Sequence, residues 1–154
     1  LRKLEVLYVV DNQIESIYDG IFDDLESLQI LKLNHNKIHS VAKNAFKNLQ
    51  QLQELDLGYN ELKSLHFSLD SLVELQIFTM YDNQLSILPE NYFKNNKKLV
   101  KILLINNQLN SIPHKIFDEI SYLNFIDFKG NICIDDEFFE ENFEVMKEKI
   151  KNDC

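Results

Sequence analysis

The sequence predicts an α/β repeat solenoid, in which stacked repeats form a parallel β-sheet along one face and a helix closes the C-terminal end. Two observations predict this fold. An asparagine recurs at a nearly constant interval, and the residues after the last one change to a helical spacing of apolar residues. The asparagines are Asn12, Asn36, Asn60, Asn83, Asn107 and Asn131, which are 24, 24, 23, 24 and 24 residues apart.

In each repeat, the spacing of apolar residues predicts one short strand before the asparagine. Apolar residues stand eight, five and three positions before all six asparagines, for example Leu28, Leu31 and Leu33 before Asn36. The last two of these positions alternate with period two, which is typical of a strand with one buried face. Strands stacked about 4.8 Å apart would form a parallel sheet and bury together the leucines that one repeat cannot bury alone.

The six asparagines have a structural role in this interpretation. Each follows its strand, where the chain turns away from the sheet. A side-chain amide has two donors and an acceptor, so it can pair with the bent backbone of its own and of the adjoining turn. We therefore expect a ladder of buried, hydrogen-bonded amides, because buried polar groups persist when they are paired.

The pattern L-x-x-L-x-L-x-x-N-x-L-x-x-L resembles the leucine-rich repeat family, in the 24-residue form with a phenylalanine spine that occurs in extracellular proteins. The spine residues stand ten positions after the asparagine in four repeats, as Phe22, Phe46, Phe93 and Phe117. The resemblance implies a horseshoe whose concave face is the sheet, with six repeats over residues 1–131, the first incomplete, and a C-terminal cap over residues 132–154. The segment Gly130-Asn131-Ile132-Cys133-Ile134 is similar to insect secreted leucine-rich repeat proteins.

Two irregularities interrupt the array. The third repeat is one residue short and has Asp70 at the spine position, so Phe67 or Leu69 must fill the spine and a local kink is expected. In the fourth repeat, Asn96 stands where other repeats have a late leucine, and we expect the loop around it to bulge outward.

The segment from Asp135 to Asn152 predicts a capping helix. Phe139, Phe143, Met146 and Ile150 recur at helical spacing, and acidic residues precede lysines, as a helix dipole favours. Such a helix would cover the last repeat and its strand edge.

Cys133 and Cys154 border this cap, and a disulfide between them would tie the helix back to the array. Two free thiols are the alternative. A bridge implies an oxidising, extracellular location. Leu1 already lies inside a repeat, so we expect the chain to be the C-terminal part of a longer protein.

Several function classes are disfavoured. The net charge of -9 argues against a nucleic-acid partner, and no apolar run approaches the length of a membrane span. The four histidines are scattered, and the sequence has neither a metal-ligand set nor a phosphate-binding glycine loop. We therefore expect neither catalysis nor a cofactor.

The concave face is the candidate site. Its outward positions lie six, four and two residues before each asparagine, and nine of these eighteen residues are aliphatic or aromatic. An exposed apolar surface of this kind favours a protein contact, although strand propensity for such residues is the alternative explanation. The candidate partner-binding residues are Tyr8, Val10, Ile30, Lys32, Asp56, Tyr59, Ile77, Tyr81, Leu103, Ile105 and Phe125.

Two functions remain open at this stage. The first is a secreted module that recognises a protein through the concave face, similar to immune or Toll-like receptor ectodomains. The second is a structural segment of an extracellular matrix-type protein that associates with copies of itself. A contact between anionic glycans and a convex basic strip, made of Lys43, Lys47, Lys94, Lys97 and Lys98, is less favoured than simple solvation of these lysines.

Overall fold

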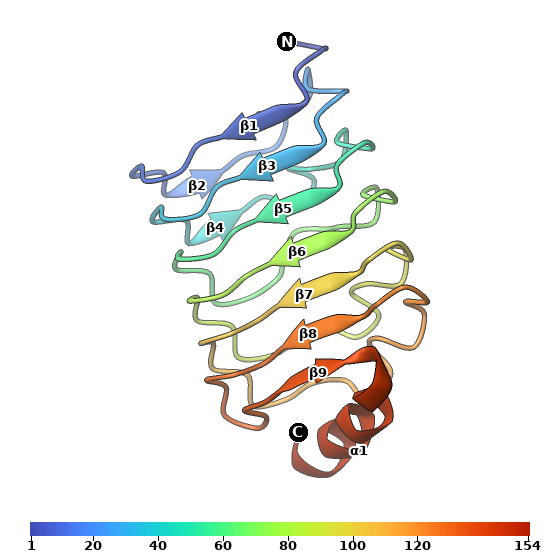
Figure 1. Ribbon diagram of the computed structural model, residues 1–154. Helices are drawn as coiled ribbons and strands as arrows, with labels where there is room; N and C mark the ends of the chain where they lie inside the picture. The colour runs from blue at the N-terminus through green and yellow to red at the C-terminus, as the bar shows by residue number, and fades with distance from the viewer.

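The computed structural model describes all 154 residues as a stack of repeats with one strand layer along its face (Figure 1). The main sheet has seven strands in the order β1-β3-β5-β6-β7-β8-β9. Its strands are β1 (Val6–Tyr8), β3 (Ile30–Lys32), β5 (Glu54–Asp56), β6 (Ile77–Thr79), β7 (Lys101–Leu103), β8 (Phe125–Asp127) and β9 (Glu137–Phe139). The first six are parallel, as the sequence predicts, and β9 is antiparallel to β8.

Equivalent residues of successive repeats are paired across the parallel strands. Leu31 pairs with Leu7 on one side and with Leu55 on the other. The register continues through the short third repeat, where Leu55 pairs with Phe78. The missing residue is therefore accommodated outside the main sheet.

A second, smaller ladder shows where the short repeat differs. It pairs β2 (Ser16–Ile17) with β4 (Ser40–Val41), and a single bridge between Ile87 and Ser111 continues it further along the chain. The third repeat contributes no strand to this ladder. The irregularity that the sequence predicts there thus takes the form of an interrupted second ladder.

The core is one continuous cluster of 40 buried hydrophobic residues. Aromatic rings run through it from repeat to repeat, with centroid distances between 5.2 and 6.2 Å. Phe67 takes the place that Asp70 leaves empty, because its ring lies 5.4 Å from that of Phe46. The rings in order are Phe22, Phe46, Phe67, Tyr92, Phe93, Phe117 and Phe128.

The expected outward bulge at Asn96 is wrong. Asn96 is fully buried, and its Nδ2 donates to the carbonyl oxygens of Leu69 and Leu72, each at 2.9 Å. The amide therefore points inward and ties the fourth repeat to the third. A leucine at this position would leave both carbonyls without that donor, which explains the polar residue in an apolar column.

The cap differs from the prediction at its start. Residues 137–139 form β9 and residues 140–142 a 3-10 turn, so that helix α1 extends only over Phe143–Asp153. The reason is the open edge of β8, whose backbone groups β9 pairs. Alternation then separates two neighbours: Phe138 is buried, whereas Phe139 faces outward and lies 4.9 Å from the ring of Phe125.

Helix α1 packs on the end of the array through Met146 and Ile150, which are both buried. A disulfide joins Cys133 to Cys154, with their Cα atoms 5.1 Å apart. Glu144 lies in the first turn of α1, and Glu140 and Glu141 lie in the 3-10 turn before it, so the prediction that the acidic run begins a helix is confirmed for these three. It is wrong for Asp135, Asp136 and Glu137, which lie before or in β9. The structure contains no helix that could span a membrane.

Candidate functional site

The asparagine ladder fixes the edge of the concave face. Asn60 shows the arrangement: its Oδ1 accepts from the backbone N–H of Ile38 at 2.9 Å, and its Nδ2 donates to the carbonyls of Leu33 and Leu57 at 3.1 Å each. Equivalent bonds are made by Asn36, Asn83, Asn107 and Asn131. Because these bonds reach back to the preceding repeat, Asn12 in the first repeat is exposed and donates only to its own turn.

The residue before each ladder asparagine has a left-handed backbone, which the sequence reasoning missed. We call this set the turn column, and its φ angles lie between 48° and 73°. Aspartate, asparagine and glycine accept this conformation readily, whereas a bulky side chain is strained in it. The turn column consists of Asp11, His35, Tyr59, Asp82, Asn106 and Gly130. The four small members were a signal that could have revealed it.

Two members of the turn column, His35 and Tyr59, begin an aromatic cluster that Tyr81 completes. The rings of His35 and Tyr59 are stacked with centroids 4.1 Å apart, and Tyr81 meets Tyr59 edge-on at 5.2 Å. Tyr81 lies over Gly58: a Cβ added to that glycine would lie 2.8 Å from Tyr81 Cε2 and nearer still to Cζ. The sequence thus leaves space in the third repeat for a ring from the fourth.

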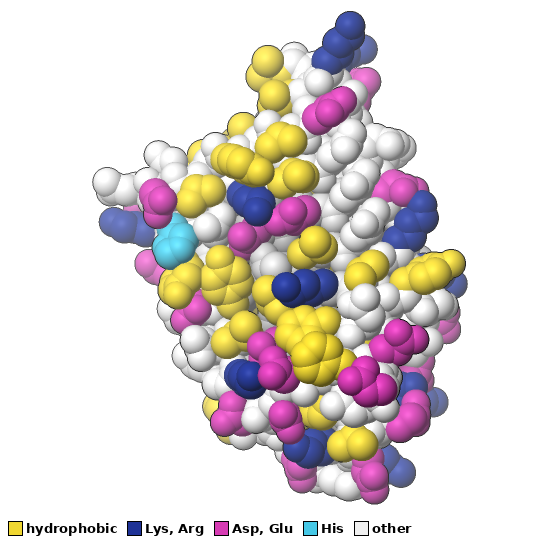
Figure 2. Space-filling model, viewed as in Figure 1, with side chains coloured by type: hydrophobic (Ala, Val, Ile, Leu, Met, Phe, Trp, Pro, Cys, Tyr) yellow, Lys and Arg dark blue, Asp and Glu magenta, His cyan; other side chains and the backbone are white.

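Two further aromatic groups lie on the same face. Tyr8 is 60% exposed, and the ammonium of Lys32 lies 5.6 Å from its ring centroid. The Phe125 and Phe139 rings lie near the other end, with the ammonium of Lys101 5.4 Å from Phe125. Figure 2 shows these hydrophobic side chains as separate patches along the strand face, with a histidine at one edge.

The remaining predicted contact residues also lie on this face, but one of them is not accessible. Val10, Ile30, Ile77, Leu103 and Ile105 are half-buried. Asp56 is only 7% exposed, and its Oδ1 accepts from the backbone N–H of Gly58 at 2.9 Å. Its carboxylate therefore holds the turn in place, and its position does not suit a partner contact.

The charges on this face are mostly paired. Lys32 bridges to Glu54 at 2.9 Å, and this hydrogen bond raises the lysine pKa above its ordinary value. Lys129 bridges to Glu137, also at 2.9 Å. Burial raises the pKa of Tyr81, and the negative charges of Asp56 and Asp82 add to this effect. The surroundings of the aromatic cluster are therefore electrically negative.

The convex lysines are also largely neutralised. Three of the five that the sequence analysis considered form ion pairs: Lys47 with Asp23, Lys97 with Glu119 and Lys98 with Glu74. Lys43 and Lys94 line a hollow of about 320 Å³ beside the short third repeat. No group of three or more His, Cys, Asp or Glu side chains is placed to hold a metal ion.

The fold and the ladder define a class, the stacked-repeat solenoid with a parallel sheet on one face. Comparison with known families identifies the family within this class. The chain matches the "Leucine rich repeat" family over residues 2–62 and 28–85, and the "BspA type Leucine rich repeat region (6 copies)" over residues 70–153. The chain therefore belongs to the leucine-rich repeat family.

Two solved structures have a similar fold. The crystal structure of the APL1 leucine-rich repeat domain aligns with a TM-score of 0.80 at 22% identity, over 84% of this chain and 35% of that one. TLR13 in its complex with ssRNA13 aligns with a TM-score of 0.67 at 27% identity, over 80% of this chain and 22% of that one. The chain spans about a third or less of the length of either. No curated protein matches the chain.

Proposed function

We propose that this chain is a recognition module of an extracellular protein and binds a protein partner across its concave face. One observation carries the proposal: aromatic and aliphatic side chains remain exposed or half-buried along this face in every repeat, from Tyr8 to Phe125. Aromatic anchors of this kind supply most of the binding energy at protein interfaces. The family supports the proposal, since leucine-rich repeat solenoids use extended concave surfaces for binding.

The extracellular location rests on the disulfide. Cys133 and Cys154 are the only cysteines and both are bridged, which is the usage expected in an oxidising compartment. The proposal includes an immune or receptor role and an origin among insect-type secreted repeat proteins, which rest on the resemblance of the repeat pattern and of the segment Gly130-Asn131-Ile132-Cys133-Ile134. We do not propose that this chain binds RNA as in the TLR13 complex. Its net charge of -9 and the ion pairs of Lys32 and Lys129 disfavour contact with a phosphate backbone.

The test begins with capture of a partner from the extracellular fluid of the source organism, followed by affinity measurement with purified components. Tyr81→Ala combined with Ile105→Ala should abolish binding, because these side chains come from neighbouring repeats on the concave face. The matched control is Lys94→Ala combined with Lys98→Ala, on the convex side, which should bind normally.

Two results would contradict the proposal. If the lysine pair abolishes capture while the Tyr81 and Ile105 variant retains it, the partner binds the convex side. If molecular mass rises with protein concentration and the concave variant abolishes that rise, the face joins copies of this chain, and the matrix-type structural role is the correct one.

A further inference from the structure

The aromatic cluster differs from the other aromatic groups of the concave face in one respect. Tyr8 and Phe125 each have a lysine of this chain over the ring, Lys32 and Lys101 respectively. No lysine or arginine of the chain lies over His35, Tyr59 or Tyr81. The face therefore has three aromatic groups, and only this one lacks a cation.

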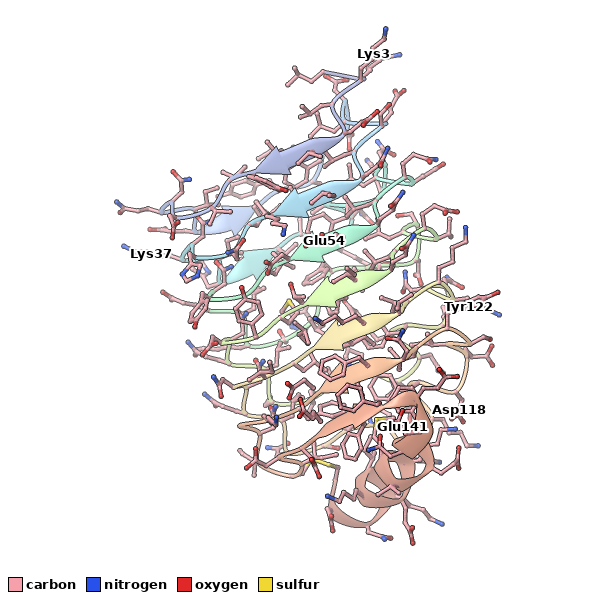
Figure 3. The ribbon with its side chains drawn as sticks, in the orientation of Figure 1. Lys3, Lys37, Glu54, Asp118, Tyr122 and Glu141 are labelled. Atoms are coloured by element: carbon pink, nitrogen blue, oxygen red, sulfur yellow. A yellow bond between two sulfur atoms is a disulfide. The ribbon has the colours of Figure 1, made fainter.

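Carboxylates, instead of a cation, lie beside the aromatic cluster. Asp11 precedes the stacked pair in the turn column, and its Oδ1 lies 4.0 Å from Nδ1 of His35. The Asp11 side chain is 80% exposed. Asp82 follows the pair in the same column, and burial together with the negative charges of Asp56 and Asp82 raises the pKa of Tyr81. Lys37 is the cation nearest to this edge in the sequence, and it extends away from the sheet (Figure 3).

The stack also has a free end. Tyr59 covers one face of the His35 ring at 4.1 Å, no other ring stacks on His35, and its side chain is 44% exposed. At the equivalent position that repeat has Asp11, whose short side chain cannot continue the stack. A flat, positively charged group placed there would stack on an aromatic ring and meet a carboxylate at the same time.

We propose that His35, Tyr59 and Asp11 form the docking site for an arginine side chain of the protein partner. The inference rests on the proposed function and names the chemistry of that partner. The guanidinium is planar, stacks on aromatic rings and pairs with a carboxylate through two parallel N–H donors, whereas an ammonium offers only a point charge. It would extend the stack of Tyr59 and His35 by one member, and the exposed carboxylate of Asp11 would neutralise it.

The backbone supports this assignment. The turn column has aspartate, asparagine or glycine in four of its six places, and rings only at His35 and Tyr59. Tyr59, the residue of the column that suits the left-handed turn least, is thus the one that stacks on His35. Strained residues of this kind gather at ligand sites.

The experiment titrates the protein with a short peptide, acetyl-Gly-Ser-Arg-Ser-Gly-amide, and follows the aromatic NMR signals of His35, Tyr59 and Tyr81. We expect saturable shifts at His35 and Tyr59. The peptide with citrulline in place of arginine has the same shape without the charge and should bind about tenfold more weakly or not at all, and the lysine peptide should be weaker than the arginine peptide.

Two variants suit the left-handed backbone and keep the fold. Asp11→Asn removes the carboxylate and Tyr59→Asn removes the ring, and either should weaken the arginine peptide several-fold while the remaining spectrum stays that of the folded protein. The control Asp118→Asn, which lies near the cap, should leave binding unchanged.

The outcomes separate this inference from the proposed function. If the arginine peptide shifts none of the three rings, or binds Asp11→Asn as well as the parent, the arginine site is wrong. If the arginine site fails in this way but the variant Tyr81→Ala with Ile105→Ala still loses the captured partner, the proposed protein recognition by the concave face stands without an arginine site. If the peptide binds as expected and that variant retains the partner, the arginine site stands and concave-face recognition of that partner fails.

Discussion

The ring of His35 stacks on that of Tyr59 with centroids 4.1 Å apart, although Tyr59 has a left-handed backbone that tyrosine tolerates poorly. In the same column, Asp11, Asp82 and Asn106 avoid most of that cost because their short polar side chains accept the conformation. The pair therefore combines local strain with a favourable stack.

Replacing Tyr59 by asparagine should change the free energy of unfolding little. Relief of the strained backbone gains about 1 kcal/mol, and loss of the stacked ring costs about the same. Tyr59→Val is the matched control: it also removes the ring, but a β-branched residue is worse at a φ of 48°, so it should be less stable than Tyr59→Asn by about 1 kcal/mol or more. Denaturant unfolding of both variants checks this, and equal stabilities would show that the turn is not strained.

Removing an interior ladder amide should be costly. Asn60→Ala leaves the buried N–H of Ile38 without its partner and removes one of the two amide donors to the carbonyl of Leu33, which keeps that of Asn36. Loss of about 1–3 kcal/mol is expected in chemical denaturation, and the same holds for Asn83→Ala. Asn12→Ala is the control, since Asn12 is exposed and makes a single bond within its own turn. A loss at Asn12 as large as that at Asn60 would contradict the ladder as the cause.

Gly58→Ala should destabilise the protein through Tyr81. The added methyl would lie 2.8 Å from Tyr81 Cε2, so the ring must move, at a cost of about 1–3 kcal/mol. In a double-mutant cycle, Tyr81→Ala should remove most of this cost, because the smaller side chain leaves room for the methyl. If Gly58→Ala costs the same with and without the Tyr81 ring, the backbone and not the ring requires glycine there.

The repeat period predicts most of the fold, because every column of the array is set by the same packing in every repeat. It predicts the strands and the amide ladder, and the two cysteines at the borders of the cap predict the disulfide; the structure contains all three. It does not predict β9, because Phe139 fits a helical spacing locally and only the open edge of β8 favours pairing. The period also places Asp56 at an outward position, but it does not predict the neighbouring residues that bury the Asp56 side chain.

The candidate site was predictable as a face but not as a cluster. Strand alternation places Tyr81 on the concave surface and Tyr59 directly beside an outward position, yet their contact depends on the left-handed turn and on the absence of a side chain at Gly58. Both are backbone properties that apolar spacing does not encode. The stack of His35 on Tyr59 depends on the same turn, and so its role could be recognised only in three dimensions.

The disulfide should contribute to the stability of the cap. It closes a loop with a sequence separation of 21 residues, for which the chain-entropy account gives about 3 kcal/mol. The intact mass should show two alkylated thiols only after reduction, and Cys133→Ser with Cys154→Ser should lower the unfolding midpoint. Alkylation of both thiols without reduction, in unfolded protein secreted from an oxidising compartment, would contradict both the bridge and the extracellular assignment.

The cap should also lose stability in acid through Asp136. The side-chain hydrogen bond from Lys149, at 2.7 Å, holds the pKa of the Asp136 carboxyl below its usual value of 3.8, and a backbone N–H bond from Glu137 adds to this. Because the pKa is lower in the folded state, the contribution is complete above the unfolded value and disappears as the pH falls through the folded one.

The stability difference between the parent and Asp136→Asn should therefore be constant from about pH 7 to pH 5 and should shrink below about pH 4. Urea unfolding of both proteins over this range measures it. Lys149→Ala should remove the largest part of the pH-dependent difference, because it removes the main cause of the lowered pKa. A difference that stayed the same down to about pH 2.5 would show that the carboxylate is not held in its charged form by the lysine.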